Sequence, residues 1–290
     1  MSKKHPVIAI TGSSGAGTTT VKRAFEHIFY RDGIKAAIVE GDSYHRFNRV
    51  EMREKVADGM SHFGADANRF DKLEELFETY GKTGTGEKRY YLHSEEEAAE
   101  HNARLGTDKN PGEFTPWEPI EEGTDVLFYE GLHGLAKSDE HDVSKFVDLG
   151  IGVVPNVNLE WIQKIHRDNA ERGYSAQATV DTILRRMPDY INYITPQFSR
   201  TDINFQRIAT VDTSNPFIAR DIPTPDESFI VIRFKDPAKF NTNFPELLNM
   251  IPHSFMSRRN TIVVPGSKMG FAMELILTPI IHQMIKKSKG

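Results

Sequence analysis

A glycine-rich run near the N-terminus has the residue types and spacing of a phosphate-binding loop. It follows a short apolar stretch and precedes a helical pattern, which is the context that such a loop requires. Glycines let successive backbone N–H groups point at phosphate oxygens, and the start of the following helix adds positive potential. The sequence therefore predicts a cradle for nucleotide phosphates made of Gly12, Ser13, Ser14, Gly15, Ala16, Gly17, Thr18, Thr19 and Thr20.

Two positions in this run bear on the metal and on the charge of the nucleotide. Thr19 stands where a hydroxyl reaches Mg²⁺, whereas Thr18 stands where the common loop pattern has a lysine. The missing ammonium leaves charge on the β- and γ-phosphates uncompensated, so we expect a cation from elsewhere in the chain. Lys164 is the first candidate for that cation.

An acidic residue follows the predicted strand 36–39 at the sheet edge where open α/β folds bind ligands. This residue is Asp42, and a carboxylate there can accept a proton from an attacking hydroxyl. The cations His45, Arg46 and Arg49 come directly after it and could hold an anionic substrate.

A second acid, Glu130, ends the predicted strand 126–129. A carboxylate at such a strand end can hold Mg²⁺ directly or through water. Gly131 and Gly134 indicate a close approach of the backbone to a ligand, and we expect His133 between them to be structural.

A predicted helical hairpin at 159–187 is rich in Lys and Arg. Within it, Lys164 and Asp168 are one turn apart and should meet, as should Arg167 and Glu171. A hairpin of this kind can close over a transferring phosphate and exclude water. The alternative interpretation is two solvated helix faces with ion pairs along each helix.

Apolar patterns predict the elements that position these residues. Short apolar stretches predict strands at 7–10, 36–39, 126–129, 151–154, 229–234 and 261–264. Helical spacing predicts helices from the loop to Gly33 and over 72–80, 159–171, 178–187 and 269–287, the last with a kink at Pro279. The first strand–helix–strand unit predicts a parallel sheet in a single α/β domain spanning 1–290. Outside its one helix, 44–118 is expected to be irregular and to cover a site.

Composition excludes several classes of protein. The 290 residues include 36 Lys and Arg against 41 Asp and Glu, a formal charge of −5 that argues against a broadly basic nucleic-acid binder. The absence of cysteine excludes disulfides, thiolate nucleophiles and zinc–cysteine sites. With no signal-peptide pattern and no apolar stretch long enough to span a bilayer, we expect a cytoplasmic location without membrane or nucleic-acid partners.

Four segments together resemble phosphoribulokinases of the bacterial type. They are the glycine-rich loop, Glu40-Gly41-Asp42-Ser43-Tyr44-His45-Arg46-Phe47, Phe128-Tyr129-Glu130-Gly131-Leu132-His133-Gly134 and the run from Lys164 to Ser175. The resemblance covers nearly the whole chain and departs from the family signature at Gln177, where glutamate is expected. It implies a three-layer α/β sandwich like that of P-loop nucleotide kinases, with a largely parallel sheet and antiparallel additions. It also implies ATP-dependent phosphorylation of the 1-hydroxyl of D-ribulose 5-phosphate in the reductive pentose phosphate pathway, with Mg²⁺.

The resemblance also implies roles for individual residues. Asp42 would be the general base, Asp168 a second acid near Mg²⁺ or the reacting hydroxyl, and Lys164 a stabiliser of the transition state. The sugar phosphate would be held by His45, Arg49, His93, Arg167 and Arg172. Bacterial members are oligomers activated by NADH, and the arginines that match those implicated in activation are Arg31, Arg186 and Arg233.

Two alternatives remain open from the residues alone. A uridine-kinase-like nucleoside kinase would share the loop and the acid at the strand end, but it would bind its substrate by stacking and amide contacts instead of cations. The second alternative is a nucleotide-sensing protein that binds ATP without catalysis, in which Thr18 would reflect the loss of phosphate transfer. ADP release with ribulose 5-phosphate or uridine separates these alternatives.

Overall fold

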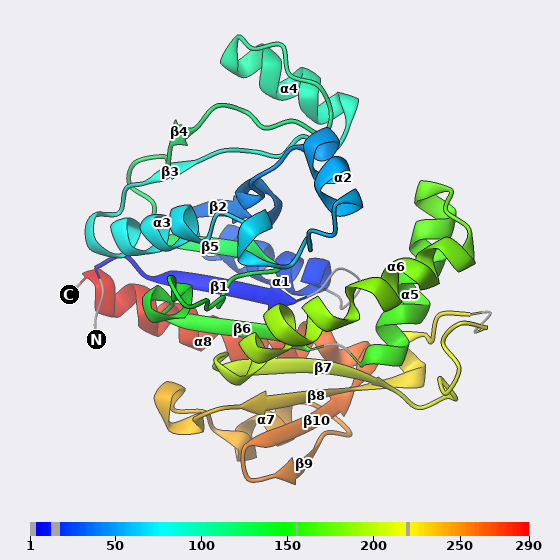
Figure 1. Ribbon diagram of the computed structural model, residues 1–290. Helices are drawn as coiled ribbons and strands as arrows, with labels where there is room; N and C mark the ends of the chain where they lie inside the picture. The colour runs from blue at the N-terminus through cyan, green and yellow to red at the C-terminus, as the bar shows by residue number, and fades with distance from the viewer. Residues whose placement is uncertain (1–3, 13–17, 155, 219–220, 290) are drawn as a thin grey trace.

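The computed structural model describes residues 4–12, 18–154, 156–218 and 221–289. Its centre is one mixed sheet with the strand order β2-β5-β1-β6-β7-β8-β10-β9 (Figure 1). Neighbours from β2 to β7 are parallel, whereas β8, β10 and β9 are added antiparallel. The predicted α/β class, with a largely parallel sheet and antiparallel additions, is confirmed.

The six predicted strands are present. They are β1 (Val7–Gly12), β2 (Ala36–Glu40), β5 (Val126–Gly131), β6 (Leu149–Val154), β8 (Ser228–Phe234) and β10 (Thr261–Pro265). The prediction missed β7 (Ile203–Ala209), β9 (Phe255–Arg258) and the small pair β3 (Glu87–Lys88) and β4 (Glu118–Pro119). Strand β7 buries only Ile203 and Phe205, and β9 is a largely exposed edge strand, so neither has a continuous apolar run.

Helices cover both faces of the sheet and complete three layers. On one face, α1 (Thr18–Arg31) packs beside α8 (Met269–Lys289), and α7 (Phe244–Met250) packs against α8. On the other face, α3 (Phe70–Thr83) buries its apolar side over β1 and β5. Helix α8 runs through Pro279 as one assigned helix. Among the described residues, no helix has both the length and the apolar character needed to cross a membrane.

The segment 44–118 is more regular than the sequence predicts. Besides α3 it contains α2 (Arg49–Ala57) and α4 (Glu95–Leu105). Each buries a single side chain, so neither shows an amphipathic stripe. Their starts depend on caps instead: Asn48 and Glu51 form a capping box on α2, and Ser94 caps α4. The expectation of an irregular excursion is wrong for these helices.

The predicted helical hairpin consists of α5 (Val157–Arg172) and α6 (Ala176–Asp189). Helix α5 ends at Gly173 in the left-handed conformation, and Ser175 caps α6. A π-helical turn over 190–194 and a 3₁₀ helix over 195–199 then lead into β7. Figure 1 shows the hairpin projecting at the edge of the sheet where β1 ends.

Candidate active site

The predicted loop starts at the sheet edge where the two predicted acids, Asp42 and Glu130, are located. Glu130 pairs in register with Ile10 of β1 and with Glu40 of β2, so the segments after these strands leave side by side. Gly12 ends β1, and Thr20 lies exposed in the first turn of α1.

Part of the predicted loop lies outside the described residues. This applies to Ser13, Ser14, Gly15, Ala16 and Gly17, and also to the side chains at positions 18 and 19.

A buried glutamine joins the end of β1 to the segment after β5. Gln197 is fully buried, and its amide nitrogen donates to the carbonyls of Leu132 and Tyr193. Its side-chain oxygen accepts from the backbone N–H of Leu135 and lies 3.1 Å from the Thr11 hydroxyl. Because these partners come from β1, the segment after β5 and the base of the hairpin, Gln197 holds three parts of the site in one arrangement.

Acidic groups gather where a metal could be bound. Lys22 of α1 contacts Glu40 at 2.7 Å. Burial opposes the charge on Lys22, but Glu40 and the neighbouring Glu130 outweigh it and raise the pKa of the lysine. No cluster of three or more His, Asp or Glu side chains in the described part of the chain could hold a metal by itself.

Gly131, the glycine after Glu130, allows two backbone segments to pack closely. A Cβ on Gly131 would lie 2.6 Å from the Cα of Gly41, so the two strand ends approach more closely than any side chain would permit. The close packing of two strand ends accounts for Gly131 within the protein itself, and the expected approach of the backbone to a ligand stays a prediction.

Asp42 lies in a short 3₁₀ turn, Gly41–Tyr44, directly after β2. Its side chain is 46% exposed, with Oδ1 3.4 Å from Nε2 of His45 and Oδ2 3.8 Å from Nε2 of His93. Burial opposes ionisation, but the hydrogen bond and charge of His45, together with His93, lower the pKa of Asp42. Asp42 is thus an ionised carboxylate that solvent and substrate can reach.

Arg49 lies beside the segment that carries His93. Its Nε donates to the Tyr91 hydroxyl at 3.3 Å, and its Nη2 donates to the carbonyl of His93 at 3.2 Å. The structure therefore brings together Asp42 and three residues predicted to bind the sugar phosphate, His45, Arg49 and His93.

An arginine that the sequence analysis did not identify, Arg89, is hydrogen-bonded to the backbone of the turn that carries Asp42. Arg89 donates to the carbonyls of Ser43 at 2.8 Å and His45 at 2.7 Å. Its guanidinium lies 3.7 Å from the ring centroid of Phe114 and 4.7 Å from that of Trp117. Burial lowers the pKa of Arg89 to about 10, which leaves the group charged at neutral pH.

The helical hairpin carries a tightly paired acid. Asp168 is buried, with Lys164 at 2.5 Å and Arg167 at 3.0 Å. The predicted pair of Lys164 and Asp168 is confirmed. Arg167 contacts Asp168, whereas the side chains of Glu171 and Arg172 lie outside the described part. Burial is the largest influence on Lys164 and lowers its pKa.

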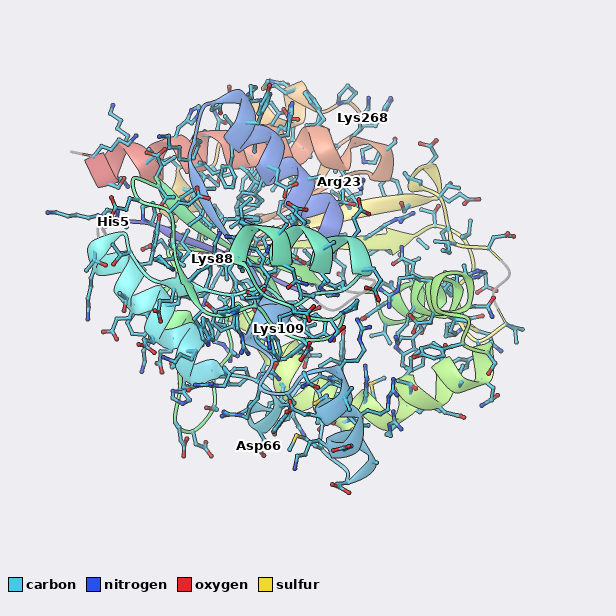
Figure 2. All side chains as sticks on the ribbon, turned by 90° about the horizontal axis from the view of Figure 1, so that it is seen from above. His5, Arg23, Asp66, Lys88, Lys109 and Lys268 are labelled. Atoms are coloured by element: carbon cyan, nitrogen blue, oxygen red, sulfur yellow. The ribbon has the colours of Figure 1, made fainter. Side chains whose placement is uncertain are left out.

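The base of the hairpin contacts the segment between α2 and α3. The Arg186 guanidinium lies 5.8 Å from the ring centroid of Phe63, and a Cβ on Gly64 would lie 3.5 Å from the Tyr193 ring. Figure 2 shows Asp66 of this segment on the same side of the molecule as α6. The neighbouring His62 has its ring centroid 6.2 Å from that of His45. Burial, with the charges of Arg186 and His45, lowers the pKa of His62 to about 4.

The three arginines matched to activation lie apart in one chain. Arg186 is on the hairpin, whereas Arg31 ends α1 and donates to Glu274 and Thr278 of α8. Arg233 alternates on β8 with side chains that face α8, so it emerges on the opposite face of the sheet. They do not form one pocket within this chain.

Four residues that complete the site were not predicted as parts of it. Asn68, Arg89 and Gln197 act through hydrogen bonds to backbone and to residues far away in sequence, and sequence spacing gives no signal for such contacts. In the sequence Arg89 has only Tyr90 and Tyr91 as aromatic neighbours, and its contacts with Phe114 and Trp117 arise from the fold. His62 gave no signal beyond its residue type.

Comparisons with known proteins agree with this geometry. A model described as "Phosphoribulokinase / Uridine kinase family" matches residues 7–214. A phosphoribulokinase of Nitrobacter vulgaris is 57% identical over 100% of this chain and 99% of its own length. The protein named "Phosphoribulokinase, plasmid" of Cupriavidus necator is also 57% identical, with the same coverage.

A solved structure gives the same result in three dimensions. The phosphoribulokinase from Rhodobacter spheroides superposes with a TM-score of 0.87 at 52% identity and covers 100% of both chains. The chain therefore belongs to the phosphoribulokinase / uridine kinase family, and within it to the phosphoribulokinases.

Proposed function

We propose that this kinase transfers the γ-phosphoryl group of ATP to the 1-hydroxyl of D-ribulose 5-phosphate, with Asp42 as the general base. The observation that carries the proposal is the half-exposed Asp42 carboxylate, flanked by His45 and His93 at the sheet edge where the phosphate-binding loop begins. An ionised acid within reach of a bound hydroxyl can take its proton. Nearby cations favour a phosphorylated sugar over an uncharged nucleoside.

In the proposed reaction the 1-oxygen of the sugar forms a bond to the γ-phosphorus. The bond between that phosphorus and the β–γ bridging oxygen breaks, and ADP leaves with the electron pair. The hydroxyl proton passes to Asp42. Protein side chains contribute by positioning the reactants and by stabilising charge, because phosphoryl transfer requires little covalent participation by the enzyme.

Cations on two sides would hold the sugar phosphate. His45, Arg49 and His93 lie together beside Asp42, and we assign Arg167 and Arg172 of the hairpin to the same ligand. Closing of the hairpin would add these arginines and exclude water from the reacting groups. Lys164 would then approach the transferring phosphate and compensate for the lysine missing at position 18.

The nucleotide and its metal would lie at the ends of β1 and β5. Residues 12–20 would bind the phosphates, and Thr19 and Glu130 would hold Mg²⁺. The carboxylate of Glu130 at the end of β5 is a donor of the type that this ion prefers. When bound, Mg²⁺ neutralises phosphate charge.

A substrate panel tests this function. ADP release is measured with ATP and Mg²⁺ in the presence of ribulose 5-phosphate, other ketopentose phosphates, unphosphorylated ribulose or uridine. We expect turnover with ribulose 5-phosphate, with the product phosphorylated at the 1-position. Turnover with uridine or with unphosphorylated ribulose at a comparable rate would refute the role of the cations.

Three further properties are proposals taken from the resemblance. We propose a place in the reductive pentose phosphate pathway in the cytoplasm, assembly into an oligomer, and activation by NADH through Arg31, Arg186 and Arg233. Rate measurements with and without NADH test activation, and light scattering of the purified protein tests assembly. Because the three arginines lie apart, single substitutions will show which of them NADH requires.

A further inference from the structure

We propose that Asn68 is a positioning residue that fixes the proton on Nδ1 of His45 and thereby makes the other ring nitrogen, Nε2, the partner of Asp42. The inference rests on the proposed function, because it takes Asp42 as the base. It assigns a task to a buried amide on a separate segment, 23 residues after His45 in the chain.

Hydrogen bonds fix the orientation of the Asn68 amide. Asn68 is 2% exposed, and its Nδ2 lies 2.8 Å from the carbonyl oxygen of His62 and 2.8 Å from that of Gly64. Carbonyl oxygens only accept, so the amide nitrogen must face them and Oδ1 must face the other way. Oδ1 lies 2.8 Å from Nδ1 of His45.

This orientation determines the tautomer of His45. Because Oδ1 of Asn68 is an acceptor, Nδ1 of His45 must donate and therefore carries a proton. In the neutral ring Nε2 would then present a lone pair to the Asp42 carboxylate, 3.4 Å away. Protonation of Nε2 removes this conflict and gives an imidazolium with a hydrogen-bond acceptor on each side.

Backbone pairing holds the two residues in place. The chain segments of His45 and Asn68 form an antiparallel bridge. The N–H of Arg46 donates to the carbonyl of Ala67 at 2.8 Å, and the N–H of Arg69 donates to the carbonyl of Tyr44 at 2.7 Å. Backbone hydrogen bonds therefore hold the segments that carry the Asn68 amide and the His45 imidazole next to each other.

The charges around His45 come from several elements. The groups that face it or its partner are Asp42 on its own turn, His62 before α3, Arg89 and His93 on the segment between α3 and α4, and His133 after β5. Burial opposes a charge on the ring, but Asp42 and Asn68 outweigh it and raise the pKa of His45. Arg89 acts in the opposite sense.

Two variants of Asn68 test whether the acceptor oxygen, and not the rest of the amide, is what His45 requires. Asn68→Ala and Asn68→Asp both lose the hydrogen bonds to the carbonyls of His62 and Gly64, but only the aspartate keeps an acceptor for His45. The histidine ¹⁵N resonances of the full-length protein are followed against pH, and the His45→Gln spectrum assigns the signal. We expect the midpoint for His45 to fall by about one pH unit in Asn68→Ala and to rise in Asn68→Asp.

The neutral form in the wild type gives an independent readout. Above its midpoint His45 should carry its remaining proton on Nδ1, and Asn68→Ala should shift this proton toward Nε2. An Nε2–H tautomer in the wild type, or midpoints that move in the same direction in both variants, would overturn the inference. Thermal unfolding of both variants reports the shared structural loss.

Kinetics extend the test to turnover. As pH rises and His45 loses its charge, the Asp42 carboxylate faces a lone pair and the sugar phosphate loses a cation, so kcat/KM should fall. This fall should begin at lower pH in Asn68→Ala and at higher pH in Asn68→Asp. A purely structural defect would lower kcat/KM at every pH without changing the pH at which the fall begins. Turnover retained by Asp42→Asn would reject the proposed base and leave the His45 titrations valid, so the two failures are distinguishable.

Discussion

Asp42 and Asp168 are both flanked by cations, but they differ in almost every property that matters for proton transfer. The side chain of Asp42 is 46% exposed, and the nearest imidazole nitrogens, Nε2 of His45 and Nε2 of His93, lie at 3.4 and 3.8 Å. The side chain of Asp168 is 4% exposed, with Lys164 at 2.5 Å and Arg167 at 3.0 Å. One acid has oxygen lone pairs within reach of a substrate, and the other has its lone pairs committed to the hairpin.

Residue type alone therefore does not identify the base. Burial opposes ionisation of Asp168, but Lys164 and Arg167 outweigh it and lower its pKa, as the histidines do for Asp42. Since both acids are ionised at neutral pH, access and pairing must distinguish their roles. We infer that Asp42 receives the proton and that Asp168 holds the cations of the hairpin in position. The place of Asp168 near Mg²⁺ or the reacting hydroxyl, which the resemblance implies, stays a prediction.

The largest expected effect is that of Asp42→Asn. Removal of the base should lower turnover by roughly 10²–10⁴-fold or more, whereas ATP binding should persist because the amide leaves the nucleotide loop intact. Steady-state rates and calorimetric titration with ATP check this prediction. Asp66→Asn, at an exposed acid nearby, serves as the control. An equal loss of ATP binding would show that Asp42 is structural.

Lys164→Met comes next and tests the proposal that Lys164 supplies the positive charge of the lysine missing at position 18. We expect turnover to fall by about 10²–10³-fold, with a much smaller change in nucleotide affinity, because the ammonium acts mainly on the transition state. A matched control is Lys82→Met, which removes an exposed pair with Glu78 that has the same spacing and a 2.5 Å contact. Unchanged turnover in Lys164→Met would place the compensating charge elsewhere.

Asp168→Asn tests the pairing within the hairpin through stability. The folded pKa of Asp168 is below its unfolded value, so its stabilising contribution is present above the unfolded pKa and is lost as pH falls through the folded pKa. We expect the variant to be less stable by on the order of 3 kcal/mol at neutral pH. The difference from wild type should shrink in acid, as measured by denaturant unfolding at several pH values. A constant difference would show that the charge of Asp168 is not what stabilises the hairpin.

The smallest expected effect concerns the turn that carries Asp42. Arg89→Lys keeps the charge but loses the planar group that lies over two aromatic rings and donates to two carbonyls of the turn. We expect kcat to fall by roughly tenfold because the turn carrying Asp42 is less well positioned. Arg104→Lys is the control, since Arg104 binds Glu118 on the surface. Equal kcat values for the two variants would reject a positioning role for Arg89.

The sequence predicted the sheet edge and the pairing of Lys164 with Asp168, because both follow from local periodicity. Asp42 follows an apolar strand, Glu130 lies at the end of another, and the hairpin pair has helical spacing. Helices α2 and α4 escaped prediction because their caps, and not an apolar face, define them. The contacts of Asn68, Arg89 and Gln197 could not be predicted, because each depends on segments brought together only by the fold.

Chemical rescue tests the assignment of the base most directly. Asp42→Gly and Asp168→Gly are assayed with ATP, Mg²⁺ and ribulose 5-phosphate while sodium formate is raised at constant ionic strength. We predict that formate restores turnover in a saturable manner in Asp42→Gly, because this accessible site can admit a small carboxylate, and that it does not do so in Asp168→Gly. Rescue of Asp168→Gly alone, or of neither variant, would contradict the assignment of Asp42 as the residue that accepts the proton.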